Sequence, residues 1–141
     1  KKIILDLNGK TITGKGDYTL ACTQVATIQN GTVINDKNAN NVTAAIYAQN
    51  TVVTVEDVTI KGANTGIACG PGVVGYYGGA IIKGDCDIYG GVTGVAVYGP
   101  NQENATTSEF KLEGGKISGG RYGIAETEVL TEPISRFRAA Q

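Results

Sequence analysis

Three ten-residue stretches of the chain share one pattern: IKGANTGIAC at residues 60–69, IYGGVTGVAV at residues 88–97 and ISGGRYGIAE at residues 117–126. In each stretch an aliphatic residue is followed by one Gly two places later and by another Gly six places later, directly before a second aliphatic residue. Looser copies begin at Ile12 and Val33. Internal repetition of this kind indicates a repeat architecture, in which each unit packs on its neighbours.

A second short apolar segment precedes each copy, so every repeat contains more than one strand. The successive copies begin 21, 27, 28 and 29 residues apart, and their turns carry Gly or Asn without a two-residue hairpin loop. We therefore predict about five flattened coils, with each strand paired in parallel to its equivalent one coil along, at a spacing of about 4.8 Å. The preceding strands are expected to end at Leu7, Ile28, Val55, Ile82 and Leu112.

Alternation along the strands predicts which side chains point inward, because successive residues of a strand face opposite sides. Gly residues are expected at the corners, where they would supply positive φ angles. The expected inward columns are Leu20, Ile46, Ile67, Val95 and Ile124, and Cys22, Ala48, Cys69 and Val97. The expected outward columns are Ala21, Tyr47, Ala68, Ala96 and Ala125, and Thr11, Thr32, Thr59, Asp87 and Lys116.

The composition agrees with an all-β domain. The 141 residues include 43 β-branched residues (Val, Ile and Thr) against 5 Leu, which favours strands and excludes a helix bundle. A net charge of −1 offers no electrostatic basis for binding nucleic acid, and no apolar run approaches the length of a transmembrane segment. The absence of His excludes His-based catalysis and His-containing zinc sites. Because Lys1 is not Met, we expect a processed product or a piece of a longer chain.

Three cysteines cannot all pair within one chain, because their number is odd. One disulfide with a spare thiol is one alternative. We favour the other, in which three unpaired thiols are buried and behave as small hydrophobic side chains.

The phrases LDLNGKTITG at residues 5–14 and LEGGKISGG at residues 112–120 resemble the pectin-lyase-like superfamily. This resemblance implies a right-handed parallel β-helix. We assign residues 1–125 to the β-helix and residues 126–141, which lack the repeat, to a C-terminal cap or subunit-contact tail. The superfamily includes lyases, hydrolases, adhesins and viral fibres, so the resemblance alone does not choose a function.

Enzymes of the superfamily use aspartates, which in the lyases bind calcium and act with a basic Arg or Lys. The best carboxylate pair here is Asp85 and Asp87, which period-2 geometry places on one outer face, with residues 56–57 one coil earlier. We favour a solvated face that keeps the sheet soluble, and we assign no catalytic residue, metal or cofactor. The candidate bases are Lys61, Lys83, Lys116 and Arg121.

Two long insertions are more informative about function than the acidic and basic residues. GPGVVGYYGG at residues 70–79 and GPNQENATTS at residues 99–108 interrupt successive coils at the same place, so we expect them to leave one edge together. Tyrosine faces suit sugar rings, and amide and carboxylate groups offer hydrogen bonds. Alternatively, the tyrosine rings fold back onto the sheet. The expected ligand-binding residues are Tyr76, Tyr77, Tyr98, Asn101 and Glu103.

These features favour a non-enzymatic module that presents loops for recognition, with carbohydrate binding or adhesion as its role. Its expected location is extracellular, on a cell surface or on a virion, and its expected partner is a glycan or surface polysaccharide. One alternative is a structural virion or cell-envelope spike or decoration protein that forms homo-oligomers through its coil ends and tail. A second alternative is a polysaccharide lyase-like enzyme.

Overall fold

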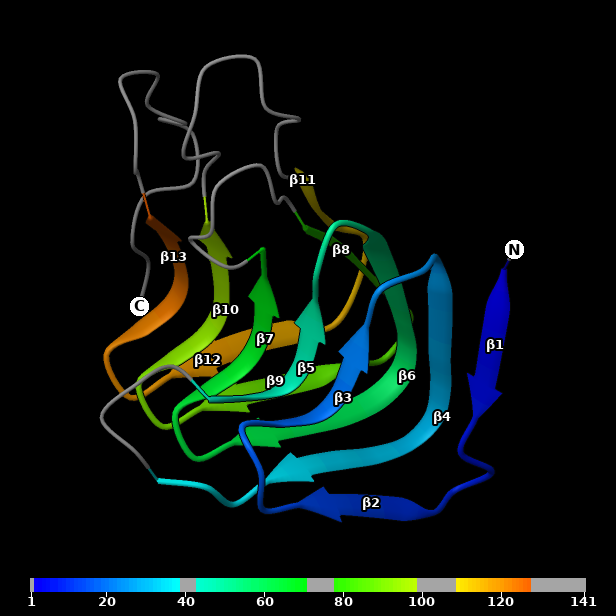
Figure 1. Ribbon diagram of the computed structural model, residues 1–141, viewed down its shortest axis with the longest axis horizontal. Coiled ribbons are helices and arrows are strands. Elements are labelled where there is room, and N and C mark those ends of the chain that lie inside the picture. Colours follow the sequence, from blue (N-terminus) through cyan, green and yellow to red (C-terminus); the bar gives the residue numbers. More distant parts are fainter. Residues whose placement is uncertain (1, 39–42, 71–77, 99–108, 128–141) are drawn as a thin grey trace.

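The computed structural model describes residues 2–38, 43–70, 78–98 and 109–127. These residues form thirteen strands and no helix, and every strand pair is parallel (Figure 1). Among them there is accordingly no helix long and apolar enough to cross a membrane. The strands are β1 (Ile3–Asp6), β2 (Thr11–Gly14), β3 (Tyr18–Cys22), β4 (Ala26–Asn35), β5 (Ala44–Ala48), β6 (Val52–Gly62), β7 (Thr65–Cys69), β8 (Gly79–Lys83), β9 (Asp87–Gly90), β10 (Thr93–Tyr98), β11 (Glu109–Leu112), β12 (Lys116–Gly119) and β13 (Tyr122–Thr127).

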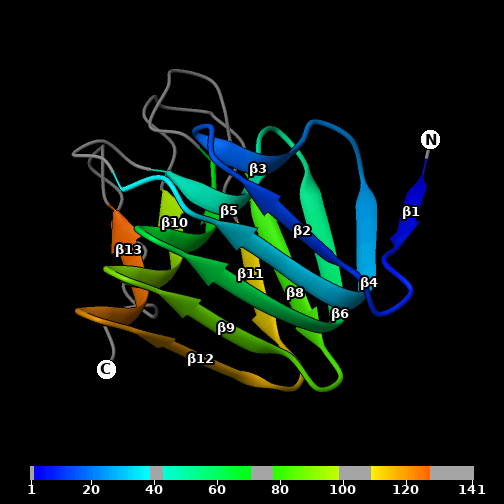
Figure 2. The same cartoon turned by 90° about the horizontal axis from the view of Figure 1, so that it is seen from below.

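The strands form three walls around one core. Wall 1 is the stack β1-β4-β6-β8-β11, and wall 2 contains β2, β9 and β12 together with the second halves of β4 and β6. Wall 3 is the five-stranded sheet β3-β5-β7-β10-β13. Walls 1 and 2 belong to one bent sheet because β4 and β6 run through both (Figure 2). The predicted all-β parallel solenoid is thus confirmed, with about four turns of the chain.

The register confirms the columns expected from the repeat. Thr11 pairs with Thr32, and the ladder continues through Thr59 and Asp87 to Lys116. Leu20 likewise begins the column that ends at Ile124. Every coil therefore adds one residue to each column, which explains why the spacing of the repeats predicted the pairing.

The expected alignment of the first coil was wrong by two residues. Leu5, not Leu7, is in register with Ile28. The first coil has a longer corner at Asn8 and Gly9, both of which have positive φ angles. Leu7 lies at this corner and packs over Gly31, where an added Cβ would be 2.4 Å from the Leu7 Cβ. Leu7 therefore fills space that the missing side chain of Gly31 leaves in the next coil.

At the corners between walls 2 and 3, the repeated glycines do not have the role that was expected of them. Gly62, Gly90 and Gly119 occupy equivalent places, but none of them is among the residues with positive φ. They are required by close approach instead, because a Cβ at Gly62 or Gly90 would lie 1.8 Å from the carbonyl oxygen three residues later. Positive φ angles occur instead at the corner between walls 1 and 2, at Asn30, Asp57, Gly84 and Gly115, and at the ends of two wall 3 strands, at Asn50 and Gly70.

The core consists of stacked aliphatic side chains that are fully buried only where a coil lies on both sides. Val55 and Ile82 are completely buried, whereas Leu112, at the end of the same column, is 48% exposed. All three cysteines are free, with Cys69 and Cys86 buried and Cys22 half-buried. Burial raises the pKa of Cys69 to about 12, which is consistent with the expectation of unpaired core thiols.

Replacing Gly90 by Ala tests the close approach at the corner. The new Cβ would overlap the Thr93 carbonyl oxygen, so we expect G90A to lower the free energy of unfolding by about 1–3 kcal/mol. Gly16→Ala is the matched control, since a Cβ there meets no atom within 4 Å and Gly16 does not have a positive φ. Chemical denaturation of both variants measures the difference, and equal stability would contradict the assigned role of Gly90.

Candidate functional site

The strands of wall 3 end side by side at one edge of the solenoid. Val97 in β10 pairs with Cys69 in β7 and with Glu126 in β13. The strands that follow the insertions also begin in register, since Gly79 in β8 pairs with Glu109 in β11. The insertions at residues 71–77 and 99–108 are therefore anchored at neighbouring points at both of their ends (Figure 1). The expectation that they leave one edge together is confirmed for the residues that hold them.

Two glycines close the base of the first insertion. Gly70 has a φ of 80° and donates a 2.8 Å hydrogen bond from its N–H to the carbonyl oxygen of Ala48. A Cβ on Gly78 would lie 2.2 Å from the Gly70 nitrogen and 2.1 Å from the same carbonyl oxygen. Only glycine fits this approach, so the two ends of the insertion meet directly above the preceding coil.

A second apolar cluster lies on the outer face of wall 3, beside this edge. We call it the outer cluster, and it consists of Ala44, Tyr47 and Ala68 with Tyr18 and Tyr98 packed against them. The rings of Tyr18 and Tyr47 stack with centroids 4.2 Å apart and planes at 18°. Tyr47 is only 7% exposed. Tyr47 thus faces outward as expected, but its ring is not solvated, because the small Ala21 and Ala68 on the neighbouring coils leave room for the rings to lie flat.

Two hydroxyl groups of the outer cluster stay protonated through the neutral pH range. Burial raises the pKa of Tyr98, with smaller contributions from the nearby Tyr18 and Cys69. Burial also raises the pKa of Tyr18, and the charge of Asp17 adds to the effect. Both phenols are therefore neutral and able to donate a hydrogen bond at physiological pH.

Tyr98 is the one predicted binding residue that lies within the described residues. It lies at the last position of β10, where the second insertion begins, and belongs to the outer cluster. Tyr76, Tyr77, Asn101 and Glu103 lie outside the described residues. Sequence reasoning missed Tyr18, whose ring packs in the outer cluster against Tyr47. Its place in β3, the strand paired with the strand that contains Tyr47, was the available signal.

The acidic residues lie on a different face, at the corner between walls 1 and 2. Asp85 and Asp87 are both exposed on either side of the buried Cys86, as the period-2 pattern predicted. Asp57 stacks below them, and its Oδ1 accepts a 2.8 Å hydrogen bond from the backbone N–H of Asp85. Glu56 instead stands in register with Lys83. Asp57 therefore has a structural role, since it fixes the start of the corner in the next coil.

The basic residues near this acidic face form loose contacts. Lys116 Nζ lies 3.8 Å from Asp87 Oδ2, and both side chains are exposed. The guanidinium of Arg121 lies over the ring of Tyr122, 5.6 Å from its centroid, rather than beside the carboxylates. Within residues 2–38, 43–70, 78–98 and 109–127, no group of three or more His, Cys, Asp or Glu residues is placed to hold a metal ion. The arrangement corresponds to a solvated ion pair of the kind that contributes little to stability.

Comparisons of this chain with protein-family models, curated proteins and solved structures found no match.

Replacing Tyr47 by Ala tests the outer cluster. Because Tyr47 is buried and stacked, we expect Y47A to lower the free energy of unfolding by about 3 kcal/mol or more. Tyr89→Ala is the matched control, since Tyr89 is 42% exposed and its loss should cost less than about 1 kcal/mol. Urea denaturation of both proteins gives the comparison, and a Y47A protein as stable as Y89A would contradict the assigned packing.

Proposed function

We propose that this protein is a non-enzymatic, pectin-lyase-like β-helix module that binds carbohydrate through the insertions anchored along one edge of wall 3. The observation that carries the proposal is the register of that edge, where the anchors of two insertions stack beside Tyr98 and the outer cluster. The proposed binding residues are Tyr76, Tyr77 and Tyr98, which would stack on sugar rings, with Asn101 and Glu103 as hydrogen-bonding groups.

Rigidity of the scaffold supports a binding role for this edge. The walls are held by continuous parallel ladders, and the ends of the first insertion are fixed by the close approach of Gly78 to Gly70. A ligand bound between anchored insertions would lose less affinity to ordering of the protein than one bound to free segments. Equivalent anchors on successive coils are also spaced at about 4.8 Å, which suits repeated contacts with an extended polymer.

The contacts of the acidic face favour this binding role over the lyase-like alternative. Asp57 is committed to the backbone of Asp85, and Lys116 forms an open surface pair with Asp87. A general base needs a fixed position within hydrogen-bond reach of the proton that it removes. The contact of the exposed Lys116 with Asp87 at 3.8 Å is instead typical of a solvated surface pair. In keeping with recognition of a glycan, we propose a location outside the cytoplasm, on a cell surface, on a virion or in the secreted state.

Replacing Tyr76 and Tyr77 together by Ala tests the proposed function. If their rings stack on sugars, the double variant should lose about tenfold or more of its affinity for the polysaccharides that retain the unaltered protein. Retention is measured by affinity electrophoresis against a panel of neutral and acidic polysaccharides, with Tyr89→Ala as the control on a different wall. Equal retention of all three proteins would contradict the proposal.

The thermal stability of the double variant separates the two roles of these rings. A melting temperature close to that of the unaltered protein is expected for residues that contact a ligand. A large decrease would instead assign the rings to packing on the sheet and would remove them from the binding site.

A further inference from the structure

One band of the solenoid carries no charge, along the edge where wall 3 is followed by wall 1. In the part of the chain that the structure describes, this band consists of residues 22–26, 48–53, 69–70, 78–81 and 97–98. None of these residues is acidic or basic. We call the band the neutral edge. It includes both anchors of the first insertion and Tyr98, where the second insertion begins.

The charged residues next to the neutral edge belong to the first and last coils. They are Lys2, Glu109, Lys111 and Glu126. In the coils between them, the first charged residues along wall 1 are Glu56 and Lys83, which are in register at the far end of that wall. Arginine and lysine are the side chains that bind anionic groups such as carboxylates. The described residues in the middle of the neutral edge therefore offer no cation to an acidic sugar.

The turn at residues 48–51 of the neutral edge lies directly beside the base of the first insertion. The N–H of Gly70 donates a 2.8 Å hydrogen bond to the carbonyl oxygen of Ala48. At the other end of the insertion, the N–H of Gly79 donates a 2.9 Å hydrogen bond to the carbonyl oxygen of Thr51. The two residues between these carbonyl groups are thus held next to the insertion that contains the proposed binding tyrosines.

These two residues, Gln49 and Asn50, have amide side chains. Asn50 is exposed and Gln49 is half-buried, and neither amide is hydrogen-bonded to another residue within the described part of the chain. An amide presents a carbonyl oxygen as an acceptor and an NH₂ group as a double donor. Sugar hydroxyl groups both donate and accept, so the two amides match them in chemistry and need no charge on the ligand.

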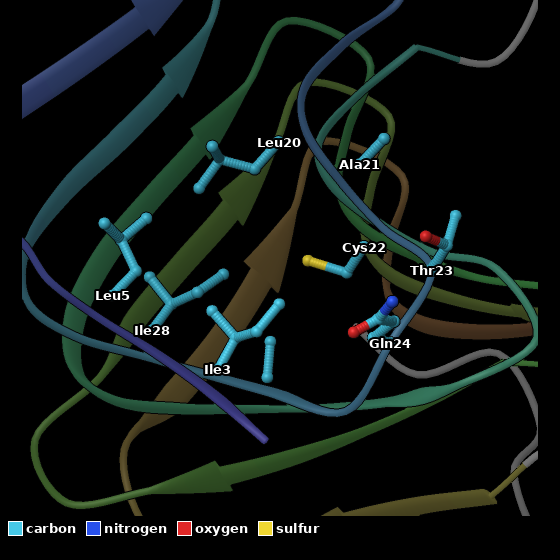
Figure 3. A pocket seen from close by; sticks show the side chains of 9 residues that line it. Ile3, Leu5, Leu20, Ala21, Cys22, Thr23, Gln24 and Ile28 are labelled. Carbon is cyan, nitrogen blue, oxygen red and sulfur yellow. The ribbon is translucent and has the colours of Figure 1, made fainter. Parts of the chain in front are cut away.

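The neighbouring turn of the first coil has the same character. Thr23 and Gln24 are exposed and lie across a hollow of ≈ 270 Å³ from its aliphatic side chains (Figure 3). The residue before them is in register with Ala48, so they are the counterparts of Gln49 and Asn50 one coil earlier. Uncharged polar side chains therefore occupy two adjacent turns, at a spacing of about 4.8 Å.

We propose that the ligand of this edge is an uncharged polysaccharide and that Gln49 and Asn50 bind its hydroxyl groups. This inference rests on the proposed carbohydrate-binding function and adds to it the charge class of the ligand and two contact residues. A carboxylate brought to the neutral edge would lose water without gaining a partner of opposite charge, which is unfavourable. A neutral sugar has no such cost, because its hydroxyl groups exchange hydrogen bonds with water for hydrogen bonds with the amides.

The charge class is tested by affinity electrophoresis of the unaltered protein. The uncharged probes are a neutral glucan and a galactomannan, and the acidic probes are polygalacturonate and alginate. We expect retention by an uncharged probe, with an affinity that changes less than about twofold between about 50 mM and 500 mM salt, because salt screens only charges. Tighter retention by the acidic probes would overturn this inference and leave the proposed binding function intact. Retention by none of the four would contradict both.

Replacing Asn50 by Gly tests the assigned contact. Asn50 has a φ of 60°, which Gly adopts without strain, so N50G removes the amide and keeps the backbone of the turn. We expect N50G to lose about threefold to tenfold of the affinity for the retained uncharged polymer, as for the loss of a hydrogen bond. The matched control is Asn8→Gly, since Asn8 is also exposed and has a φ of 50°, but lies at the corner between walls 1 and 2.

The melting temperatures of N50G and N8G complete the test. Both should stay close to that of the unaltered protein, so that a difference in affinity reports on contact with the ligand. Equal affinities of the two variants would overturn the assignment of Asn50. A lower melting temperature for N50G than for N8G would also overturn it, because the amide would then stabilise the turn.

Discussion

The parallel hydrogen-bond ladder between neighbouring coils is the interaction on which the structure depends. It keeps equivalent residues of successive coils in register, so that one aliphatic side chain per coil builds each column of the core. No single coil contains enough apolar surface to fold alone. The complete burial of Val55 and Ile82, and the 48% exposure of Leu112 at the end of their column, follow from this dependence.

The corners show how the chain turns without breaking the ladders. At one corner Asn30, Asp57, Gly84 and Gly115 supply the positive φ angles, and the Asp57 side chain also accepts a hydrogen bond from the backbone of the next coil. At the other corner Gly62 and Gly90 allow the chain to pass close to a carbonyl oxygen. Asn35 replaces glycine there in the second coil, where its buried amide donates to the Gly16 carbonyl oxygen. The two corners thus impose different demands on similar residues.

Most of the fold could be predicted because the repeat fixes the register. The column from Thr11 to Lys116 and the column from Leu20 to Ile124 followed from spacing and alternation alone. Leu7 was misaligned because the first corner is longer, and a spacing rule does not detect a residue that packs over a glycine of the next coil. The repeated glycines are visible in the sequence, but the sequence does not show whether a glycine is needed for a positive φ angle or for a close approach of the backbone.

The candidate site could be predicted only as far as its anchors. The shared position of the insertions was visible in the sequence, and the register of β7, β8, β10 and β11 confirms it for the flanking residues. The burial of Tyr47 could not be read from alternation, since an outward residue is normally solvated. Its burial depends on stacking with Tyr18, a contact between residues 29 positions apart in the chain.

Amide hydrogen exchange in dilute solution tests most directly the claim that each coil is stabilised by its neighbours. Slowest exchange is predicted in β7 and β6, which have a coil on both sides, and fastest exchange in β1, β2 and β12. Protection should therefore rise from either end of the stack toward its middle. Exchange in β1 as slow as in β7 under these conditions would contradict the claim.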